Sequence, residues 1–216
     1  ENESRIALEV LKQMSEAVAV VDPSFHFISV NPAFSRITGY TREEIIGKSR
    51  SILSSEQHDK AFYSASQRQL LETGHWSGDL WQKRKDQGEF LSTVDVSEVL
   101  DSNGHRAYFV AVVNDITDRK RVEQELIHLA NYDSLTGLPS RPLLIEKLSK
   151  AIINARRNQN RVALLFLDLD NFKTVNDRFG HSEGDAVLRR ATKGISDNLR
   201  PYDLACRLGG EEFALI

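Results

Sequence analysis

A glycine pair that ends an alternating strand pattern limits what this chain can fold into more than any other feature. Residues 204–208 alternate apolar and polar side chains, which predicts a strand. Gly209 and Gly210 follow, and such a pair suits a two-residue hairpin turn with positive φ at both positions. A turn of that length pairs the flanking residues as Leu208 with Glu211, Arg207 with Glu212 and Cys206 with Phe213. The sequence therefore predicts an antiparallel hairpin with two adjacent carboxylates at its tip.

The tip of this hairpin is suited to binding a charged ligand. Glu211 and Glu212 stand beside a backbone without side chains, which lets a metal ion and a phosphate group approach closely. For this stretch alone, a surface hairpin with a solvated acidic tip is the alternative, because glycine turns with acidic neighbours are common.

A second acidic cluster follows an apolar run earlier in the chain. Residues 162–167 are almost continuously apolar, a pattern typical of a strand that is buried on both faces. The run ends in Asp168, Leu169 and Asp170. A carboxylate at the end of a buried strand is costly unless it is paired or bound to a cation. We therefore expect this cluster and the hairpin tip to converge on one divalent cation.

Together the two stretches resemble the GGDEF family of diguanylate cyclases. Residues 209–213 match all five positions of its Gly-Gly-Asp/Glu-Glu-Phe turn. Residues 133–141 resemble its opening segment and read DSLTGLPSR, with Ser140 where Asn is commoner. The family joins two GTP molecules into cyclic di-GMP and releases two pyrophosphates. The resemblance therefore implies metal-dependent phosphoryl transfer, in which each 3′-hydroxyl attacks the α-phosphate of the other nucleotide.

The resemblance implies a metal centre with oxygen ligands. It assigns Asp168 and Glu211 as ligands, with the Leu169 carbonyl as a third, and this set suits Mg²⁺ or Mn²⁺. Glu212 is implied either as a further ligand or as a group that helps to activate the attacking hydroxyl.

The resemblance also implies residues that hold the nucleotide. Asp185 and Asn176 match positions that select guanine, whose N1–H and N2–H₂ donors a carboxylate accepts together. Lys173 is placed for phosphate contact, and Gly209 and Gly210 let the substrate approach the backbone. Taken singly, these polar residues have ordinary structural readings: a helix N-cap for Asp185, which we expect in the first turn of its helix, and solvated faces for the other two.

A further motif matches the inhibitory site of the family. Arg200 and Asp203 form its Arg-x-x-Asp pattern, five residues ahead of the glycine turn. The guanidinium suits phosphate or guanine, and the carboxylate accepts from guanine N–H groups. An ion pair within the loop is the structural alternative.

The first half of the chain predicts a small α+β domain that resembles a PAS sensor domain. Two strands, short helices and three antiparallel strands follow in order, with a longer helix expected over residues 55–73. The resemblance rests on residues 31–34, 37–40 and 44–48, which read NPAF, ITGY and EIIGK. It implies the fold but not the ligand, because such domains bind haem, flavins, small acids or nothing.

Two kinds of residue bear on that ligand. Trp76 and Trp81 suggest a flavin pocket, although aromatic residues of a small sheet are usually core. His58 would suit haem iron, but its neighbours are polar and we expect it to be exposed, which disfavours haem. The PAS ligand therefore stays unassigned.

The join between the halves predicts a dimer contact. Val122, Leu126 and Leu129 form one apolar seam on a helix over residues 117–130. So short a seam gains stability by pairing with a second copy as a coiled coil. Packing of the helix on its own domain is the alternative. Beyond it, we expect a helix from Pro142 with Ile145, Leu148 and Ile152 on one face.

The composition of the chain bears on its cellular compartment and on its binding partners. The chain has 216 residues and a net charge of −3, so nothing suggests nucleic acid or a membrane surface as a partner. A single cysteine and the lack of any apolar run of membrane-spanning length favour the cytoplasm, either alone or as the cytosolic part of a membrane-anchored protein. The chain begins at Glu1, and the family domain is about twice as long as residues 131–216. We therefore expect a piece of a longer protein that does not turn over by itself.

These observations combine into one domain plan. Residues 1–117 are expected to form the PAS sensor, residues 118–130 a signalling helix, and residues 131–216 the N-terminal half of a GGDEF domain. We expect a homodimeric, sensor-regulated cyclase that uses GTP and is inhibited by cyclic di-GMP. A non-catalytic nucleotide-binding regulator of a downstream domain, and a PAS dimerisation module alone, are the alternatives.

Overall fold

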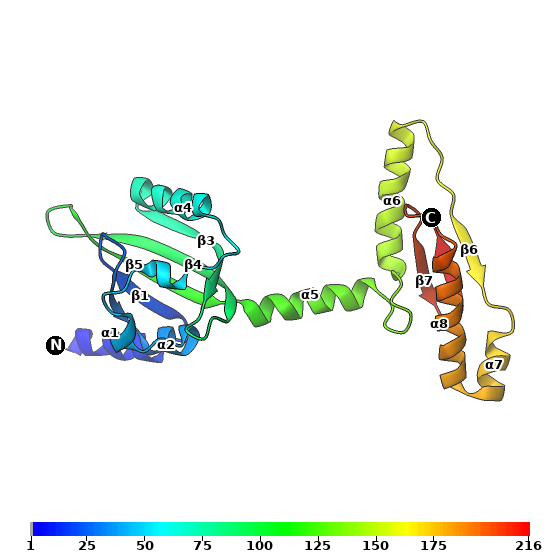
Figure 1. Ribbon diagram of the computed structural model, residues 1–216, viewed down its shortest axis with the longest axis horizontal. Helices are drawn as coiled ribbons and strands as arrows, with labels where there is room; N and C mark the ends of the chain where they lie inside the picture. The colour runs from blue at the N-terminus through cyan, green and yellow to red at the C-terminus, as the bar shows by residue number, and fades with distance from the viewer. Residues whose placement is uncertain (1) are drawn as a thin grey trace. The chain divides into compact units, whose positions relative to one another are not determined.

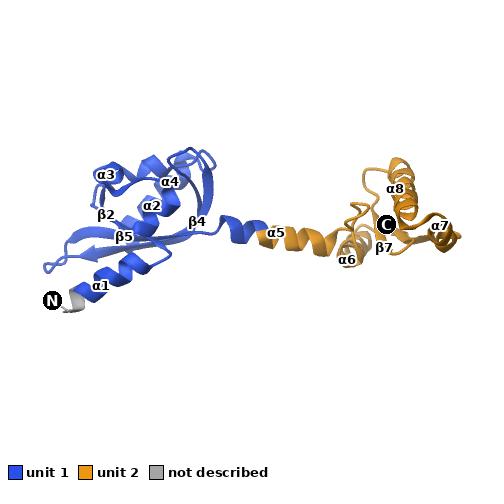
Figure 2. Cartoon of the chain, turned by 90° about the horizontal axis from the view of Figure 1, so that it is seen from below, with its two compact units in different colours: residues 1–121 blue, residues 122–216 orange. Residues whose placement is uncertain are grey.

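The computed structural model describes residues 2–216 as two compact units, one up to Arg121 and one from Val122 onward (Figure 2). Each unit has its own antiparallel sheet with helices beside it (Figure 1). The predicted α+β class is therefore confirmed. Within residues 2–216, no helix combines the length and apolar character needed to cross a bilayer.

The sheet of the first unit contains five antiparallel strands in the order β2-β1-β5-β4-β3. The strands span Ala17–Val21 (β1), Phe27–Val30 (β2), His75–Lys83 (β3), Glu89–Leu100 (β4) and Arg106–Asp115 (β5). β1 pairs with β5 along its whole length, from Ala17 opposite Val113 to Val21 opposite Phe109. Alternation along the strands places one face of the sheet against the core.

The helices of this unit begin where the sequence supplies caps. They span Asn2–Gln13 (α1), Pro32–Thr38 (α2), Arg42–Ile45 (α3), Lys60–Thr73 (α4) and a short 3₁₀ helix, Arg50–Leu53 (η1). The Asn31 side chain accepts a hydrogen bond from the Phe34 N–H. Thr41 and Glu44 form a reciprocal capping box, as their spacing predicts.

The expected helix over residues 55–73 is too long at its start. α4 begins at Lys60, because Asp59 caps it by accepting from the Phe62 N–H. The preceding segment is held differently: the Tyr63 hydroxyl accepts from the Ser55 N–H and donates to the Ser55 carbonyl.

The core of the first unit is built around large aromatic side chains. Phe34, Phe90 and Phe109 are fully buried, and Phe109 stacks on Phe25 with ring centroids 5.1 Å apart. Burial of a phenylalanine side chain contributes roughly 1.5–3 kcal/mol. All residues of this core cluster belong to the first unit.

The helix α5, Thr117–Asn131, has no buried residue. Its seam is exposed, with Leu126 and Leu129 retaining 62% and 58% of their accessible surface. Among the described residues, the seam of α5 therefore does not pack on its own domain, which was the alternative. Dimerisation through the seam stays a prediction.

The second unit has a three-stranded sheet in the order β6-β8-β7. The strands span Leu165–Asp168 (β6), Ala205–Gly209 (β7) and Glu212–Leu215 (β8), and the helices span Arg141–Arg157 (α6), Phe172–Phe179 (α7) and His181–Asp197 (α8). Phe213 on β8 packs against Phe172 and Leu188 from α7 and α8. Cys206 is buried beside Leu144 of α6, and burial raises the pKa of its thiol to about 11.

One expectation about burial in this unit is wrong. All four residues of β6 are exposed, with Phe166 at 68%, because β6 lies at the edge of the sheet and only β8 pairs with it. On α6 the buried residues are Leu143 and Leu144, whereas Ile145 is exposed. The predicted apolar face of α6 instead borders an open groove.

Candidate functional site

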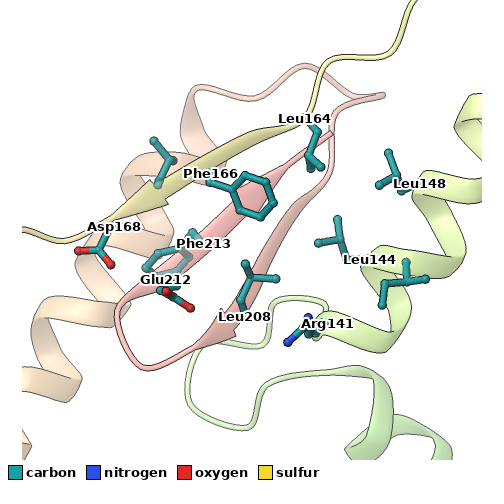
Figure 3. Close-up of a pocket in the computed structure, with 11 residues that line it drawn as sticks. Arg141, Leu144, Leu148, Leu164, Phe166, Asp168, Leu208, Glu212 and Phe213 are labelled. Atoms are coloured by element: carbon teal, nitrogen blue, oxygen red, sulfur yellow. The ribbon is translucent and has the colours of Figure 1, made fainter.

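The structure brings two of the predicted acidic residues together across neighbouring strands. Asp168, the last residue of β6, is paired directly with Glu212, the first residue of β8. Figure 3 shows both side chains at the same end of the two strands. Glu211 lies in the turn immediately before β8 and is half-buried.

The glycine turn differs by one residue from the expected register. Gly209 pairs with Glu212, so Gly210 and Glu211 form the turn. Below it, Arg207 pairs with Phe213 and the register shifts at Leu208. This bulge takes up the extra residue and moves Glu212 from its expected place opposite Arg207.

Both glycines adopt the positive φ that was predicted. Gly209 has φ 149° and Gly210 has φ 50°, values that residues with a Cβ rarely adopt. The backbone therefore depends on glycine at both positions, even though only Gly210 lies in the turn itself.

Arg207 is a positioning residue that the sequence reading did not identify. Its Nη1 donates to both carboxylate oxygens of Asp133, at 2.9 and 3.0 Å. Its Nε and Nη2 donate to the Gly210 carbonyl at 3.0 and 2.8 Å, and its own N–H donates to the Pro139 carbonyl. One side chain thus ties the opening segment of the unit to the glycine turn. The signal available in the sequence was an arginine two residues before the glycine pair.

Asp133 is held in its charged form. Burial raises the pKa of its carboxyl, but hydrogen bonds from Thr136 and Arg207 outweigh that effect and leave the pKa below its ordinary value. An ionised Asp133 keeps Arg207 fixed, and Arg207 keeps the turn fixed.

The acidic residues of this site have no cationic side chain paired with them. Among the described residues, none forms an ion pair with Asp168, Asp170, Glu211 or Glu212. Like charges directly opposite each other on a sheet are destabilising. A divalent cation is the kind of ligand that would relieve this repulsion.

The complete ligand set, however, is not assembled. In the described part of the chain, no three His, Cys, Asp or Glu side chains gather closely enough to hold a metal ion. The Leu169 carbonyl follows Asp168 and accepts a hydrogen bond from the Phe172 N–H at 3.3 Å. The predicted ligands, which are the Asp168 and Glu211 carboxylates and the Leu169 carbonyl, are all oxygen atoms, and such ligands suit a hard cation.

The residues predicted for guanine lie on α7 and α8. Asn176 is half-buried against Gly184, where a Cβ would collide with the Asn176 Oδ1. Gly184 therefore lets the two helices approach and places Asn176 beside the residue next to Asp185. Asp185 lies in the second turn of α8, not the first, because the helix begins at His181. Lys173 is exposed on α7.

A groove of about 470 Å³ lies between α6 and the sheet. Figure 3 shows Asp168 and Glu212 from the sheet and Arg141 from the start of α6 along it. The rest of its lining is mainly apolar and comes from Leu144, Ile145, Leu148, Leu164, Phe166, Leu167, Leu208 and Phe213. Arg141, the last residue of the opening motif, adds a positive charge to the lining of this groove.

The Arg-x-x-Asp motif forms a turn at the surface. The Asp203 carboxylate accepts from the Arg200 backbone N–H at 3.0 Å, and the Asp203 N–H donates to the Arg200 carbonyl. Asp203 therefore holds the backbone of the turn and not the guanidinium of Arg200. Both side chains are exposed.

The three PAS residues considered for a ligand fall in different environments. Trp76 faces a cavity above the sheet, whereas Trp81 lies five residues along β3 and therefore on the opposite face. His58 is half-buried, not exposed as expected, and stacks on Phe62 at 4.2 Å. Its Nε2 accepts a hydrogen bond from the Trp81 N–H at 2.9 Å, so this nitrogen is not free to bind haem iron.

Comparison with known proteins agrees with both halves of this description. A family described as "PAS domain" matches residues 15–118, and one described as "Diguanylate cyclase, GGDEF domain" matches residues 130–216. The chain has a PAS domain followed by a GGDEF domain of the diguanylate cyclase family. The resemblances stated from the sequence are thereby confirmed.

Individual relatives extend over both domains. The chain is 30% identical over 213 residues to "Probable diguanylate cyclase DgcE" of Escherichia coli, a match that covers 95% of this chain and 19% of that protein. It is also 30% identical over 212 residues to "Cyclic di-GMP phosphodiesterase PdeR" of the same organism, covering 97% of this chain and 32% of the relative. The chain therefore spans less than a third of the length of either protein.

A solved structure supports the fold of the first domain. The crystal structure of a PAS domain from Colwellia psychrerythraea matches 55% of this PAS–GGDEF chain and 99% of its own length. The TM-score is 0.51 at 19% sequence identity, so the similarity concerns the fold alone.

Proposed function

We propose that this chain is the sensory and nucleotide-binding part of a diguanylate cyclase that condenses two GTP molecules into cyclic di-GMP and two pyrophosphates. The domain plan assigns residues 1–117 to the sensor, 118–130 to the coupling helix and 131–216 to the nucleotide-binding unit. One observation carries the proposal: Asp168 and Glu212 face each other without a cationic partner beside a turn that requires glycine. Membership of the GGDEF family supports it.

The reaction joins two nucleotides in two equivalent steps. The 3′-oxygen of each GTP forms a bond to the α-phosphorus of the other, while the bond from that phosphorus to the pyrophosphate oxygen breaks. The hydroxyl proton passes to a carboxylate, a role that we assign to Glu212. Lys173, exposed on α7, contacts the departing phosphates.

Asp168, the Leu169 carbonyl and Glu211 would hold Mg²⁺ or Mn²⁺. When bound, the ion neutralises charge on the phosphate oxygens. The repulsion between Asp168 and Glu212 makes this end of the sheet receptive to a cation. Gly209 and Gly210 leave the backbone open to the phosphates.

Asn176 and Asp185 would select guanine over adenine. Guanine offers adjacent donors to the Asp185 carboxylate, and the Asn176 amide both donates and accepts. Adenine lacks that pair of donors and would leave polar groups unpaired. The packing of Asn176 against Gly184 supports this assignment, because it restricts the amide to a small region next to Asp185.

Each chain binds one GTP, so turnover requires two chains. We assign their contact to the exposed seam of α5. Product inhibition is assigned to Arg200 and Asp203, since the turn leaves the Arg200 guanidinium exposed and outside the proposed catalytic centre.

The test is cyclic di-GMP formation from GTP and Mg²⁺, measured in this chain and in the longest polypeptide that contains it. Glu211→Gln should reduce turnover by about a hundredfold or more in whichever polypeptide is active, because it removes a charged ligand at similar size. Arg200→Ala should preserve turnover and weaken inhibition by cyclic di-GMP. Normal turnover by Glu211→Gln would contradict the metal assignment.

A second candidate function is a GTP-binding regulator without cyclase activity. One finding favours it: the relative named as a cyclic di-GMP phosphodiesterase matches 97% of this chain. GTP binding that depends on Asp185, with no product formed in any polypeptide containing the chain, would support this function over the first.

A further inference from the structure

The PAS domain contains a second candidate site that the cyclase reaction does not use. A cavity of about 660 Å³ lies between the inner face of the sheet and the segment formed by η1 and α4. Its wall is largely apolar and includes Leu70, Trp76, Leu80 and Val94. This volume is within the range of small-molecule sites.

The charged groups around this cavity are of one sign. Arg50 and Lys60 line it, and no Asp or Glu is found among its lining residues in the described part of the chain. An apolar cavity with cationic side chains and no carboxylate favours an anion.

Arg50 is the cation placed to receive that anion. It is half-buried, lies 4.9 Å from the Phe25 ring centroid and donates from Nη2 to the Gln67 Oε1 at 3.3 Å. No described acidic side chain forms an ion pair with it. Burial lowers the pKa of its guanidinium, and this reflects the cost of keeping a cation away from water without a counter-ion.

Gln82 supplies an independent observation that points to a ligand. It is 8% exposed on the cavity-facing side of β3, and its Oε1 has no hydrogen-bond partner. A buried acceptor without a donor is costly to the folded protein. A ligand that donates an N–H or O–H to this oxygen would remove that cost.

We propose that the PAS cavity binds an amphipathic organic acid. Its carboxylate pairs with Arg50, its aromatic or alkyl body lies against the apolar wall, and an N–H or O–H group donates to the Gln82 Oε1. The proposal is independent of the proposed cyclase reaction, because ligand binding is measured without GTP and without turnover.

The test uses three acids as probes and compares each with its neutral amide. The probes are indole-3-acetate, 4-hydroxyphenylacetate and 12-hydroxydodecanoate, titrated calorimetrically into the 216-residue chain. At least one acid should bind about tenfold or more tightly than its amide, because the amide cannot form the charge-assisted hydrogen bond that Arg50 donates to a carboxylate. For that probe, blocking its N–H or O–H by methylation should weaken binding.

Variants distinguish recognition from loss of fold. Arg50→Gln should remove the preference for acid over amide, and Arg50→Lys should retain part of it. Gln82→Leu should keep that preference but should make the methylated and unmethylated probes bind with equal affinity. Arg42→Gln, an exposed arginine outside the cavity, should behave like the parent chain. Far-ultraviolet circular dichroism checks that each variant is folded.

Three results would overturn the proposal. They are absence of binding by all three acids, equal affinity for the acids and their amides, and a flavin or haem absorption spectrum in the purified chain.

Discussion

Two similar apolar strands, one in each unit, differ in how far their side chains are buried. β1 reads AVAVV and is flanked by β2 and β5, and four of its five residues are buried. β6 reads LFLD, has β8 on one side only, and all four of its residues are exposed. The difference shows that the apolar content of a strand sets what it can bury, whereas its place in the sheet sets what it does bury.

Two phenylalanines make the contrast quantitative. Phe109 on β5 is fully buried, whereas Phe166 on β6 retains 68% of its accessible surface. The same side chain should therefore contribute several kcal/mol in the first unit and very little in the second.

The largest expected effect is the loss of the Phe109 ring. Phe109→Ala should destabilise the first unit by about 3–5 kcal/mol, because it leaves a cavity and removes the stacking on Phe25. Phe166→Ala should change the stability of the second unit by about 0.5 kcal/mol or less. Both tryptophans, Trp76 and Trp81, lie in the first unit, so denaturant unfolding followed by tryptophan fluorescence reports that unit separately.

Far-ultraviolet circular dichroism follows the remaining transition in the same samples. Similar losses of stability for the two substitutions would mean that the ring of Phe166 is covered in solution, and the contrast between the two strands would then be wrong.

A smaller effect on stability is expected from loss of the ion pair between Asp133 and Arg207 in the second unit. Asp133→Asn should cost about 1–2 kcal/mol at neutral pH, a range lowered to allow for the 24% of its side chain that water reaches. The pKa of Asp133 is depressed on folding, so this stabilisation is present above the unfolded pKa and is lost as the pH falls through the folded value.

The measurement is the difference in unfolding free energy between the parent chain and Asp133→Asn as a function of pH. The difference should be constant near neutrality and should decrease below about pH 4. Glu146→Gln, which removes an exposed pair with Lys150 in the same unit, is the matched control and should have a far smaller effect. A pH-independent difference for Asp133→Asn would contradict the role given to its charge.

The smallest effect on stability is expected from an insertion in α5. Insertion of four residues after Glu125 should leave the unfolding of each unit within about 0.5 kcal/mol of the parent, because α5 buries no residue. It rotates the rest of the helix by about 40° net and should alter cyclase activity, whereas seven residues nearly restore the seam and should preserve it. Equal activity of the two insertions, with dimerisation verified, would make α5 a passive tether.

Local signals in the sequence predicted much of the fold. The capping box of Thr41 and Glu44 and the positive φ of both glycines depend on neighbouring residues, and both are confirmed. The two family resemblances also rested on short motifs and are confirmed.

Features that depend on distant residues were not predictable in this way. The bulge at Leu208 shifts the hairpin by one residue, and counting along the chain does not reveal it. The exposure of β6 depends on which strands flank it. Arg207 acquires its role through Asp133, which lies 74 residues earlier in the chain.

In the proposed reaction, the carboxylates at the end of β6 and the start of β8 form a cation site for a nucleotide. The most direct test is Mn²⁺ binding, followed by electron paramagnetic resonance, in the longest polypeptide that contains the chain and with a non-hydrolysable GTP analogue present. Asp168→Asn should weaken Mn²⁺ binding by about tenfold or more, whereas Asp197→Asn, an exposed aspartate at the end of α8, should leave it unchanged. Equal Mn²⁺ affinity in the parent and Asp168→Asn would show that Asp168 is not a ligand of the cation.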